Sequence, residues 1–171
     1  MKITLVGFMG SGKSTVGKLL SERLGVPFLD LDELIVEREG MSIPEIFERK
    51  GESYFRAIER ELLEEVLSGE ASVILSVGGG LFTTEENVGL VNSLSTSIFL
   101  DADFEVLWNR ISSDKNRPLV RRGKEKVREI FEKRLPFYGK AHLRVRTDLL
   151  SPEEAVEEII EKLSLEGKAS R

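Results

Sequence analysis

Gly7-Phe8-Met9-Gly10-Ser11-Gly12-Lys13-Ser14 decides the fold, because it fits the spacing Gly-x4-Gly-Lys-Ser/Thr between a β-branched run and a helical pattern. Glycines allow consecutive backbone N–H groups to turn toward phosphate oxygens, and the following helix adds the positive end of its dipole. The stretch therefore predicts a phosphate-binding loop over residues 7–14. In this loop Lys13 would hold the β- and γ-phosphates of a nucleotide, and the Ser14 hydroxyl would ligate Mg²⁺.

Short β-branched runs alternate with helical stripes along the rest of the chain. The patterns predict strands over 3–6, 28–30, 73–77, 96–100 and 143–146. They predict helices over 13–24, 33–38, 44–50 and 52–67, one around Trp108, one containing Arg134, and a last helix. In that last helix Ser151 is the N-cap, Pro152 takes the first position and Glu154 closes a capping box. We expect the tail, 165–171, to fray. Strands alternating with helices indicate an α/β fold, a parallel sheet between two helical layers.

Length and composition narrow the class of protein. The 171 residues suit one domain, and 30 acidic against 25 basic residues leave a net charge of −5, which argues against a nucleic-acid binder. Without cysteine and with one histidine, disulfides, thiolate metal sites and multi-histidine sites are excluded. No apolar run approaches the roughly 20 residues of a membrane span, and the N-terminal apolar stretch is too short for a secretory signal. We expect a cytoplasmic, monomeric, single-domain protein over residues 1–171.

Several acidic and basic residues have two interpretations on the sequence alone. Asp30 and Asp32 could divide the work between a metal and an acceptor hydroxyl, or cap the helix that starts near Glu33. Asp101 ends a hydrophobic run as in some ATPases, but Ala102 follows where a catalytic Glu would stand, so we interpret Asp101 as a strand-end cap. No Asn/Thr-Lys-x-Asp guanine motif of a GTPase occurs. Residues 112–126, which include Lys115 and Arg117, are rich in bases and resemble a mobile flap that seeks polyanions.

Further motifs follow the phosphate-binding loop in a fixed order. They are Phe-Leu-Asp-Leu-Asp at 28–32, Gly-Glu-Ser-Tyr-Phe-Arg-Ala-Ile-Glu at 51–59, three glycines at 78–80, Arg-Pro-Leu at 117–119 and Arg-Leu-Pro-Phe-Tyr at 134–138. With residues 7–15 they cover about 2–163, and together the chain resembles the shikimate kinases of the nucleoside-monophosphate-kinase branch of P-loop proteins. The resemblance implies a five-stranded sheet in the order 2-3-1-4-5, an acceptor-binding subdomain at about 32–60 and a lid at about 112–126.

The resemblance also implies an activity, ATP-dependent phosphorylation of the 3-hydroxyl of shikimate, and the residues that serve it. Asp32 matches the acid that binds the acceptor hydroxyls and takes up the proton, and Arg56 and Arg134 match the pair that clamps the acceptor carboxylate. Asp30 matches the acid that reaches Mg²⁺ through water beside Ser14. The remaining matches are the acceptor wall Gly78, Gly79 and Gly80, the lid arginine Arg117, the ATP-binding residues Gly10, Ser11, Gly12, Lys13 and Thr15, and Arg110 and Pro152 beside adenine.

The residues alone leave alternatives open. Arg56 could pair with Glu52 or Glu59 along its helix, Arg134 could form an internal ion pair, and Arg117 could be a solvated loop charge. A kinase for gluconate or a nucleoside monophosphate, and a nucleotide-dependent binding module without turnover, remain competing functions. Leu149-Leu150-Ser151-Pro152 lacks the polar or basic side chain that many relatives place near adenine. We therefore expect backbone and apolar contacts to the base.

Overall fold

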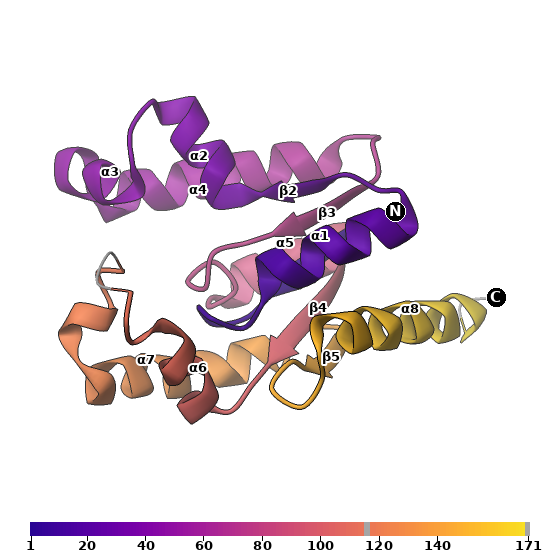
Figure 1. The fold of residues 1–171 in the computed structure, drawn as a ribbon. Helices are drawn as coiled ribbons and strands as arrows, with labels where there is room; N and C mark the ends of the chain where they lie inside the picture. The colour runs from indigo at the N-terminus through magenta and orange to yellow at the C-terminus, as the bar shows by residue number, and fades with distance from the viewer. Residues whose placement is uncertain (115–116, 170–171) are drawn as a thin grey trace.

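A five-stranded parallel sheet forms the centre of the computed structural model, which describes residues 1–114 and 117–169 (Figure 1). The strand order is β2-β3-β1-β4-β5, as the resemblance implies. The strands are β1 (Lys2–Val6), β2 (Phe28–Asp30), β3 (Val73–Ser76), β4 (Thr96–Asp101) and β5 (Leu143–Arg146). The helices are α1 (Lys13–Leu24), α2 (Leu31–Glu39), α3 (Ile43–Lys50), α4 (Glu52–Ser68), α5 (Glu85–Leu94), α6 (Phe104–Ile111), α7 (Lys124–Tyr138) and α8 (Pro152–Ala169), with a 3₁₀ turn at Val120–Arg122.

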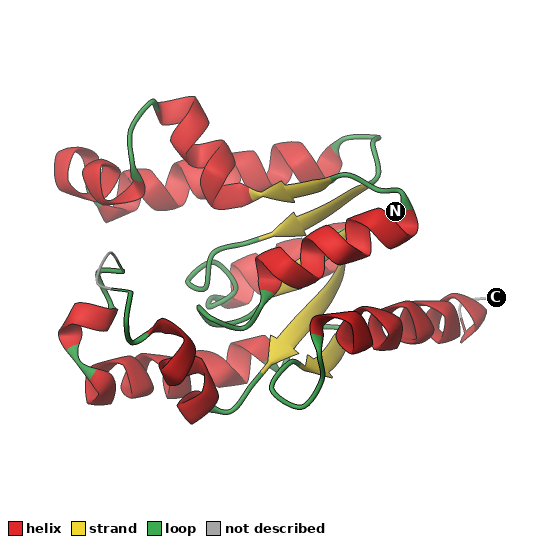
Figure 2. Cartoon of the chain, viewed as in Figure 1, coloured by secondary structure: helices red, strands yellow, loops and turns green. Residues whose placement is uncertain are grey.

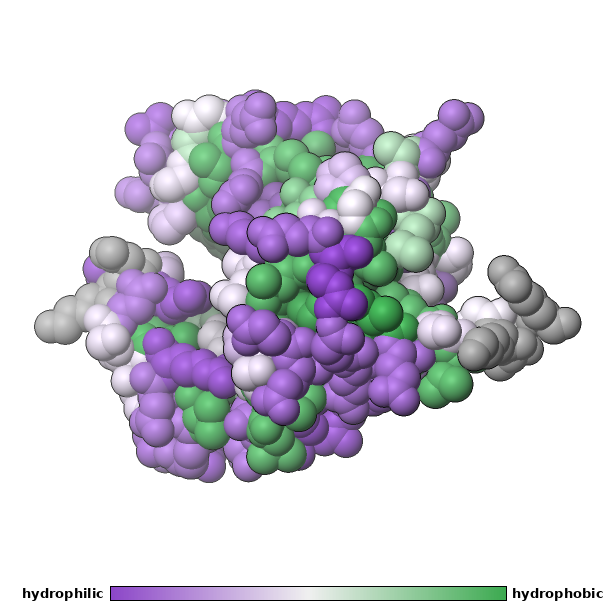
Figure 3. Space-filling model, turned by 45° about the vertical axis from the view of Figure 1, so that its right-hand side comes forward, coloured by the Kyte–Doolittle hydropathy of each residue, from purple (hydrophilic) through white to green (hydrophobic). Residues whose placement is uncertain are grey.

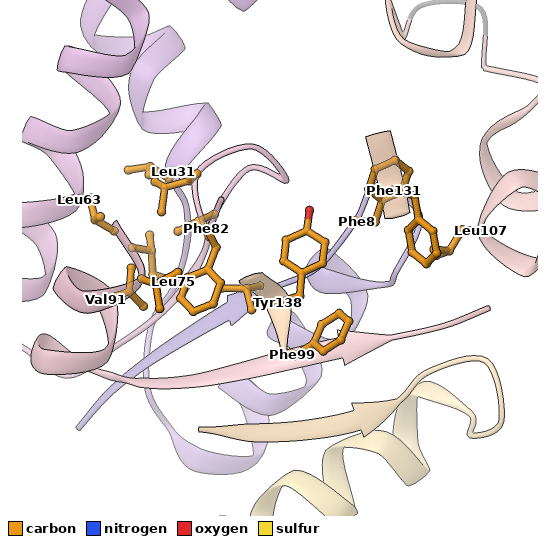
Figure 4. Packing of buried hydrophobic residues seen from close by; sticks show 14 of the residues in the cluster. Phe8, Leu31, Leu63, Leu75, Phe82, Val91, Phe99, Leu107, Phe131 and Tyr138 are labelled. Carbon is orange, nitrogen blue, oxygen red and sulfur yellow. The ribbon is translucent and has the colours of Figure 1, made fainter. Parts of the chain in front are cut away.

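The sheet lies between two apolar layers because successive strand residues face opposite sides. Leu5 of β1 belongs to the cluster that α1 and α8 cover, whereas its neighbour Val6 belongs to the cluster under α4, α5 and α7. Figure 2 shows the parallel strands between these helices. In Figure 4, Tyr138 stands between Phe82 and Phe8 in the second cluster, with its hydroxyl pointing away from Phe99. The three-layer α/β/α prediction is confirmed.

Helix boundaries follow the predicted caps, with two differences. Ser151 and Glu154 form the expected capping box, because the Glu154 N–H donates to Ser151 Oγ at 3.1 Å and the Ser151 N–H donates to Glu154 Oε1 at 3.0 Å. Helix α5 was not predicted, because its apolar stripe is short and is interrupted by Gly89 and Asn92. Thr84 caps this helix by accepting a hydrogen bond from the Asn87 N–H at 3.1 Å. The expected fraying of 165–171 is wrong for most of the tail, since α8 continues to Ala169; residues 170–171 lie outside the described part.

The carboxyl ends of the strands meet at one edge of the sheet, where ligands bind in open α/β folds. β1 leads into the phosphate-binding loop, β2 into Asp30 and Asp32, β3 into the three glycines, and β5 into Thr147. The cap interpretation of Asp101 is wrong, because the N-cap position of α6 belongs to Asp103 and Asp101 instead accepts a hydrogen bond from Arg144 Nε of β5 at 2.7 Å. Among the described residues, no helix has the length and apolarity needed to cross a membrane.

Candidate active site

The phosphate-binding loop adopts a conformation that depends on its glycines. Gly10 and Gly12 have φ angles of 81° and 96°, in the left-handed region that costs glycine little. The Lys13 ammonium folds back over the loop, donating to the carbonyl of Gly7 at 2.5 Å and to that of Phe8 at 3.3 Å. Burial lowers the pKa of Lys13 to about 8, although Asp32 and Asp30 oppose that shift. A bound phosphate group would add negative charge beside this ammonium and so favour its protonated form.

The three glycines after β3 lie directly against three side chains of the predicted acceptor site. A Cβ on Gly78 would lie 3.1 Å from Asp32 Oδ1, one on Gly79 would lie 3.0 Å from Arg134 Nη1, and one on Gly80 would lie 2.7 Å from Arg56 Nη2. At Gly78 and Gly79 the facing group would have to give by a few tenths of an ångström, and at Gly80 the end of the Arg56 side chain would have to shift. The backbone of 78–80 therefore forms a wall on which a carboxylate and two guanidinium groups are set side by side.

Asp30 and Asp32 take different places, which settles part of the ambiguity in the sequence. Asp30 caps α2, since its Oδ1 accepts from the Asp32 N–H at 2.9 Å and from the Glu33 N–H at 3.4 Å. Asp32 lies in the first turn of α2 and faces the glycine wall. Burial, and then the charge of Asp30, raise the pKa of Asp32, while Lys13 and Arg56 act against that rise. The cap interpretation holds for Asp30, yet both residues line the same cavity.

Arg56 forms an ion pair with the buried side chain of Glu59, on the same helix. Its Nη1 donates to Glu59 Oε1 at 2.8 Å, and the Glu59 side chain is only 2% exposed. Burial raises the pKa of Glu59 even though Arg56 counteracts it. The helical ion pair left open by the sequence is therefore real. It leaves 37% of the Arg56 side chain exposed, so the guanidinium can also meet a ligand.

A single cavity of about 1490 Å³ joins the phosphate-binding loop to these groups. This volume is larger than one small ligand needs and leaves room for two. Hydrophilic side chains cover much of the face shown in Figure 3, with apolar side chains gathered near its centre. Every site residue predicted above lines the cavity: Gly10, Ser11, Gly12, Lys13, Ser14, Thr15, Asp30, Asp32, Arg56, Gly78, Gly79, Gly80, Arg110, Arg117, Arg134 and Pro152.

Comparison with known proteins agrees with this geometry. A family model described as shikimate kinase matches residues 9–164. A curated relative, the shikimate kinase of Aquifex aeolicus (strain VF5), is 48% identical over 169 residues, covering 99% of this chain and 98% of the relative. The chain belongs to the shikimate kinase family. The bifunctional shikimate kinase/3-dehydroquinate synthase of Thermotoga maritima is 50% identical over 139 residues, which are 81% of this chain and 28% of that protein.

Two solved kinase structures have folds similar to that of this chain. The shikimate kinase from Acinetobacter baumannii, solved in complex with shikimate, is 37% identical with a TM-score of 0.88, covering 98% of this chain and 94% of that one. A gluconokinase from Sinorhizobium meliloti has a TM-score of 0.69 at 19% identity, covering 98% of this chain and 94% of that one. The second likeness shows a shared fold alone.

The residues predicted for the lid and for adenine, Arg117, Arg110 and Pro152, also line the cavity. Arg117 Nε donates to Asp114 Oδ2 at 3.1 Å, so the predicted lid arginine is paired within its own loop here. Lys115, which belongs to the predicted basic flap, lies outside the described residues. Arg110 Nη1 donates to the Gly10 carbonyl at 2.8 Å, and Pro152, the first residue of α8, also lines the cavity. Their roles toward adenine stay predictions.

Tyr138, to which the sequence alone assigned no role, contacts the glycine wall. Its buried hydroxyl donates to the Gly79 carbonyl at 2.6 Å and so orients the glycine wall. Burial raises the pKa of Tyr138 to about 12. Tyr138 follows Arg134 by four residues and therefore lies on the same helical face, a spacing that could have indicated a shared task.

The lowered pKa of Lys13 predicts a pH-dependent stability difference between the wild type and Lys13→Met, both freed of nucleotide. Between about pH 8 and pH 10.5 the unfolded lysine still binds a proton that the folded protein has lost, so wild-type stability rises with pH in that window. The Met variant lacks this gain. Thermal unfolding should show the Tm of the variant falling relative to that of the wild type as pH rises from about 7 to about 10.

Lys133→Met, which removes a lysine that is 76% exposed on α7, controls for the loss of one positive charge. A Lys13→Met difference that stays constant with pH, or moves in favour of the variant, would contradict the burial of this ammonium.

Proposed function

We infer that the chain transfers the γ-phosphoryl group of ATP to the 3-hydroxyl of shikimate, giving shikimate 3-phosphate and ADP. The observation that carries this inference is the glycine wall. It aligns Asp32, Arg134 and Arg56 in the same cavity as the phosphate-binding loop. A hydroxyl-bearing carboxylic acid needs one acid for its hydroxyls and a cationic site for its carboxylate, and this wall carries both. Membership of the shikimate kinase family supports the same acceptor.

On the acceptor side, we propose that Arg56 and Arg134 bind the carboxylate, since the planar guanidinium group matches a carboxylate with two parallel hydrogen bonds. Arg134 lies over the Phe8 ring at 5.6 Å, and Arg56 rests on Glu59, so both guanidinium groups are oriented before substrate binds. The apolar ring of Phe47 lines the cavity beside them. Gly78, Gly79 and Gly80 let the acceptor ring approach the backbone closely.

Asp32 is the proposed proton acceptor. As the new P–O bond forms, the 3-hydroxyl loses its proton to the Asp32 carboxylate, and the bond between the γ-phosphorus and the oxygen of ADP breaks. The raised pKa of Asp32, caused by burial and by Asp30, makes this carboxylate a better base than an exposed aspartate. The proton then leaves to solvent with product release.

On the nucleotide side, the N–H groups of the phosphate-binding loop and Lys13 would neutralise the transferred phosphoryl group. The donor set fits Mg²⁺, which is commonly bound by one or two protein oxygens together with substrate phosphates. Ser14 would be the direct ligand, and Asp30 would reach the ion through water. When bound, Mg²⁺ would supply positive charge that offsets the charge of the phosphates. Arg117 would leave Asp114 to reach the phosphates, and Arg110 and Pro152 would enclose adenine.

We also propose a domain organisation, an oligomeric state and a cellular location for the protein. Residues 1–171 would act as one kinase unit, with about 32–60 binding the acceptor and about 112–126 forming the lid that excludes water. All the proposed contacts to both substrates come from one copy of the chain, which supports a monomer. We place the protein in the cytoplasm, where ATP is available. The net charge of −5 offers nucleic acid no general attraction.

A coupled ADP-release assay with shikimate, quinate, gluconate and AMP tests the proposed function. The two-arginine wall predicts turnover with shikimate and much less with AMP, which has no carboxylate. Preferred turnover of gluconate or AMP would favour a related small-molecule kinase. No turnover with any of the four would favour a nucleotide-binding module that lacks catalysis.

Replacing Asp32 with Asn should lower kcat by about a hundredfold or more, because the proton acceptor is lost while the shape of the side chain is kept. Calorimetry should show ATP binding retained. Asp103→Asn is the matched control, since it removes a carboxylate that is 77% exposed and outside the cavity. Near-normal turnover by the Asp32 variant would refute the assigned role.

A further inference from the structure

Two side chains from outside the phosphate-binding loop hold two of its consecutive carbonyl groups. The Thr147 hydroxyl donates to the Ser11 carbonyl at 2.7 Å, across 136 positions of sequence. Arg110 donates to the Gly10 carbonyl at 2.8 Å and, with its other terminal nitrogen, to the Thr147 carbonyl at 3.0 Å. The turn after β5 is thereby bonded to the loop both directly and through Arg110.

A peptide unit is planar and trans, so its C=O and N–H point in opposite directions. The Ser11 carbonyl and the Gly12 N–H belong to one such unit. Holding this carbonyl toward Thr147 therefore turns the Gly12 N–H away from Thr147. We propose that Thr147 is a positioning residue for nucleotide binding, which sets the direction of the Gly12 N–H before a phosphate group arrives. The proposal rests on the proposed function only in taking ATP as the nucleotide.

Backbone hydrogen bonds hold the loop on either side of the Ser11 carbonyl. The Ser11 N–H donates to the Phe8 carbonyl at 3.2 Å, and the Gly12 carbonyl accepts from the Val16 N–H at 2.9 Å. Ser11 is 1% exposed, and its own hydroxyl has no hydrogen-bond partner among the described residues. Gly12 carries no side chain, so its φ of 96°, in the left-handed region, costs it little. The hydroxyl of Thr147 is thus the one side-chain donor to the Ser11 carbonyl within the described part of the chain.

Thr147 is itself rigidly placed, which a positioning residue requires. It is 7% exposed, and its N–H donates to the Asp101 carbonyl at 2.8 Å. On the next residue, Asp148 accepts two hydrogen bonds from Arg146, at 2.9 and 2.7 Å, and one from the Asp103 N–H at 3.0 Å. The turn after β5 is therefore fixed to the end of β4 and to the start of α6.

Thr147→Val tests the proposal, because valine keeps the shape of threonine and loses only the hydroxyl. Calorimetry should show the Kd for ADP rising by roughly threefold to tenfold, the size expected for one hydrogen bond. In steady-state kinetics the KM for ATP should rise while the KM for shikimate stays unchanged. Thr147→Ser, which keeps the hydroxyl, should restore ADP affinity.

Thr4→Val is the matched control, since Thr4 is fully buried in β1 and, within the described part of the chain, its hydroxyl bonds only to Ser95 Oγ, at 2.7 Å, away from the cavity. It should lower the Tm and leave the Kd for ADP unchanged. Should Thr147→Val not fold, Thr147→Ser against Thr147→Ala makes the same comparison with smaller side chains.

The proposal is overturned if removal of the hydroxyl leaves ADP affinity unchanged, if the KM for shikimate rises equally, or if Thr147→Ser is as impaired as Thr147→Val. Failure of the proposed function looks different. In that case the wild type itself does not phosphorylate shikimate, while ADP calorimetry still compares the variants.

Discussion

Everything at this site depends on backbone N–H groups of the phosphate-binding loop being able to face one point. The carbonyls of the same loop also need donors, because a buried carbonyl without a partner costs free energy. Lys13 donates to Gly7 and Phe8, Arg110 to Gly10, and Thr147 to Ser11. The N–H of Val16 donates to Gly12 at 2.9 Å. The loop is thus organised largely before any nucleotide binds, which lowers the cost of ordering it on binding.

On the acceptor side of the cavity, several positively charged side chains lie close together. Arg56 and Arg134 both lie on the glycine wall, and Lys13 lies within reach of Asp32 electrostatically. Glu59, buried below Arg56, and Asp32, beside Gly78, supply the opposing charge. An acidic chain can therefore hold an anion-binding cavity, because its cations gather where the substrates bind and its buried acids keep them in place. Glycine at 78–80 lets these charged groups lie close to the backbone without being pushed aside by a Cβ.

Much of this could be predicted from the sequence. The glycine-rich loop, its strand and its helix are local patterns, and the boundaries of α1 and β5 agree with those expected from periodicity and caps. The order of motifs led to Asp32, Arg56 and Arg134, and all three meet in one cavity. What the sequence could not show are contacts between distant segments. Thr147 bonds to Ser11 with no local signal for that contact. The spacing of Tyr138 from Arg134 indicates a shared helical face but not the bond from Tyr138 to Gly79. Helix α5 was missed because its short stripe is interrupted by glycine and asparagine.

The most direct measurement of this account is a crystal structure of the protein with ADP, Mg²⁺ and shikimate. Phosphate oxygens should accept hydrogen bonds from the N–H groups of residues 10–14, with the Ser11 carbonyl still bonded to Thr147. The shikimate carboxylate should lie between Arg56 and Arg134, against the glycine wall. A nucleotide bound away from the loop, or a carboxylate out of reach of both arginines, would contradict this arrangement.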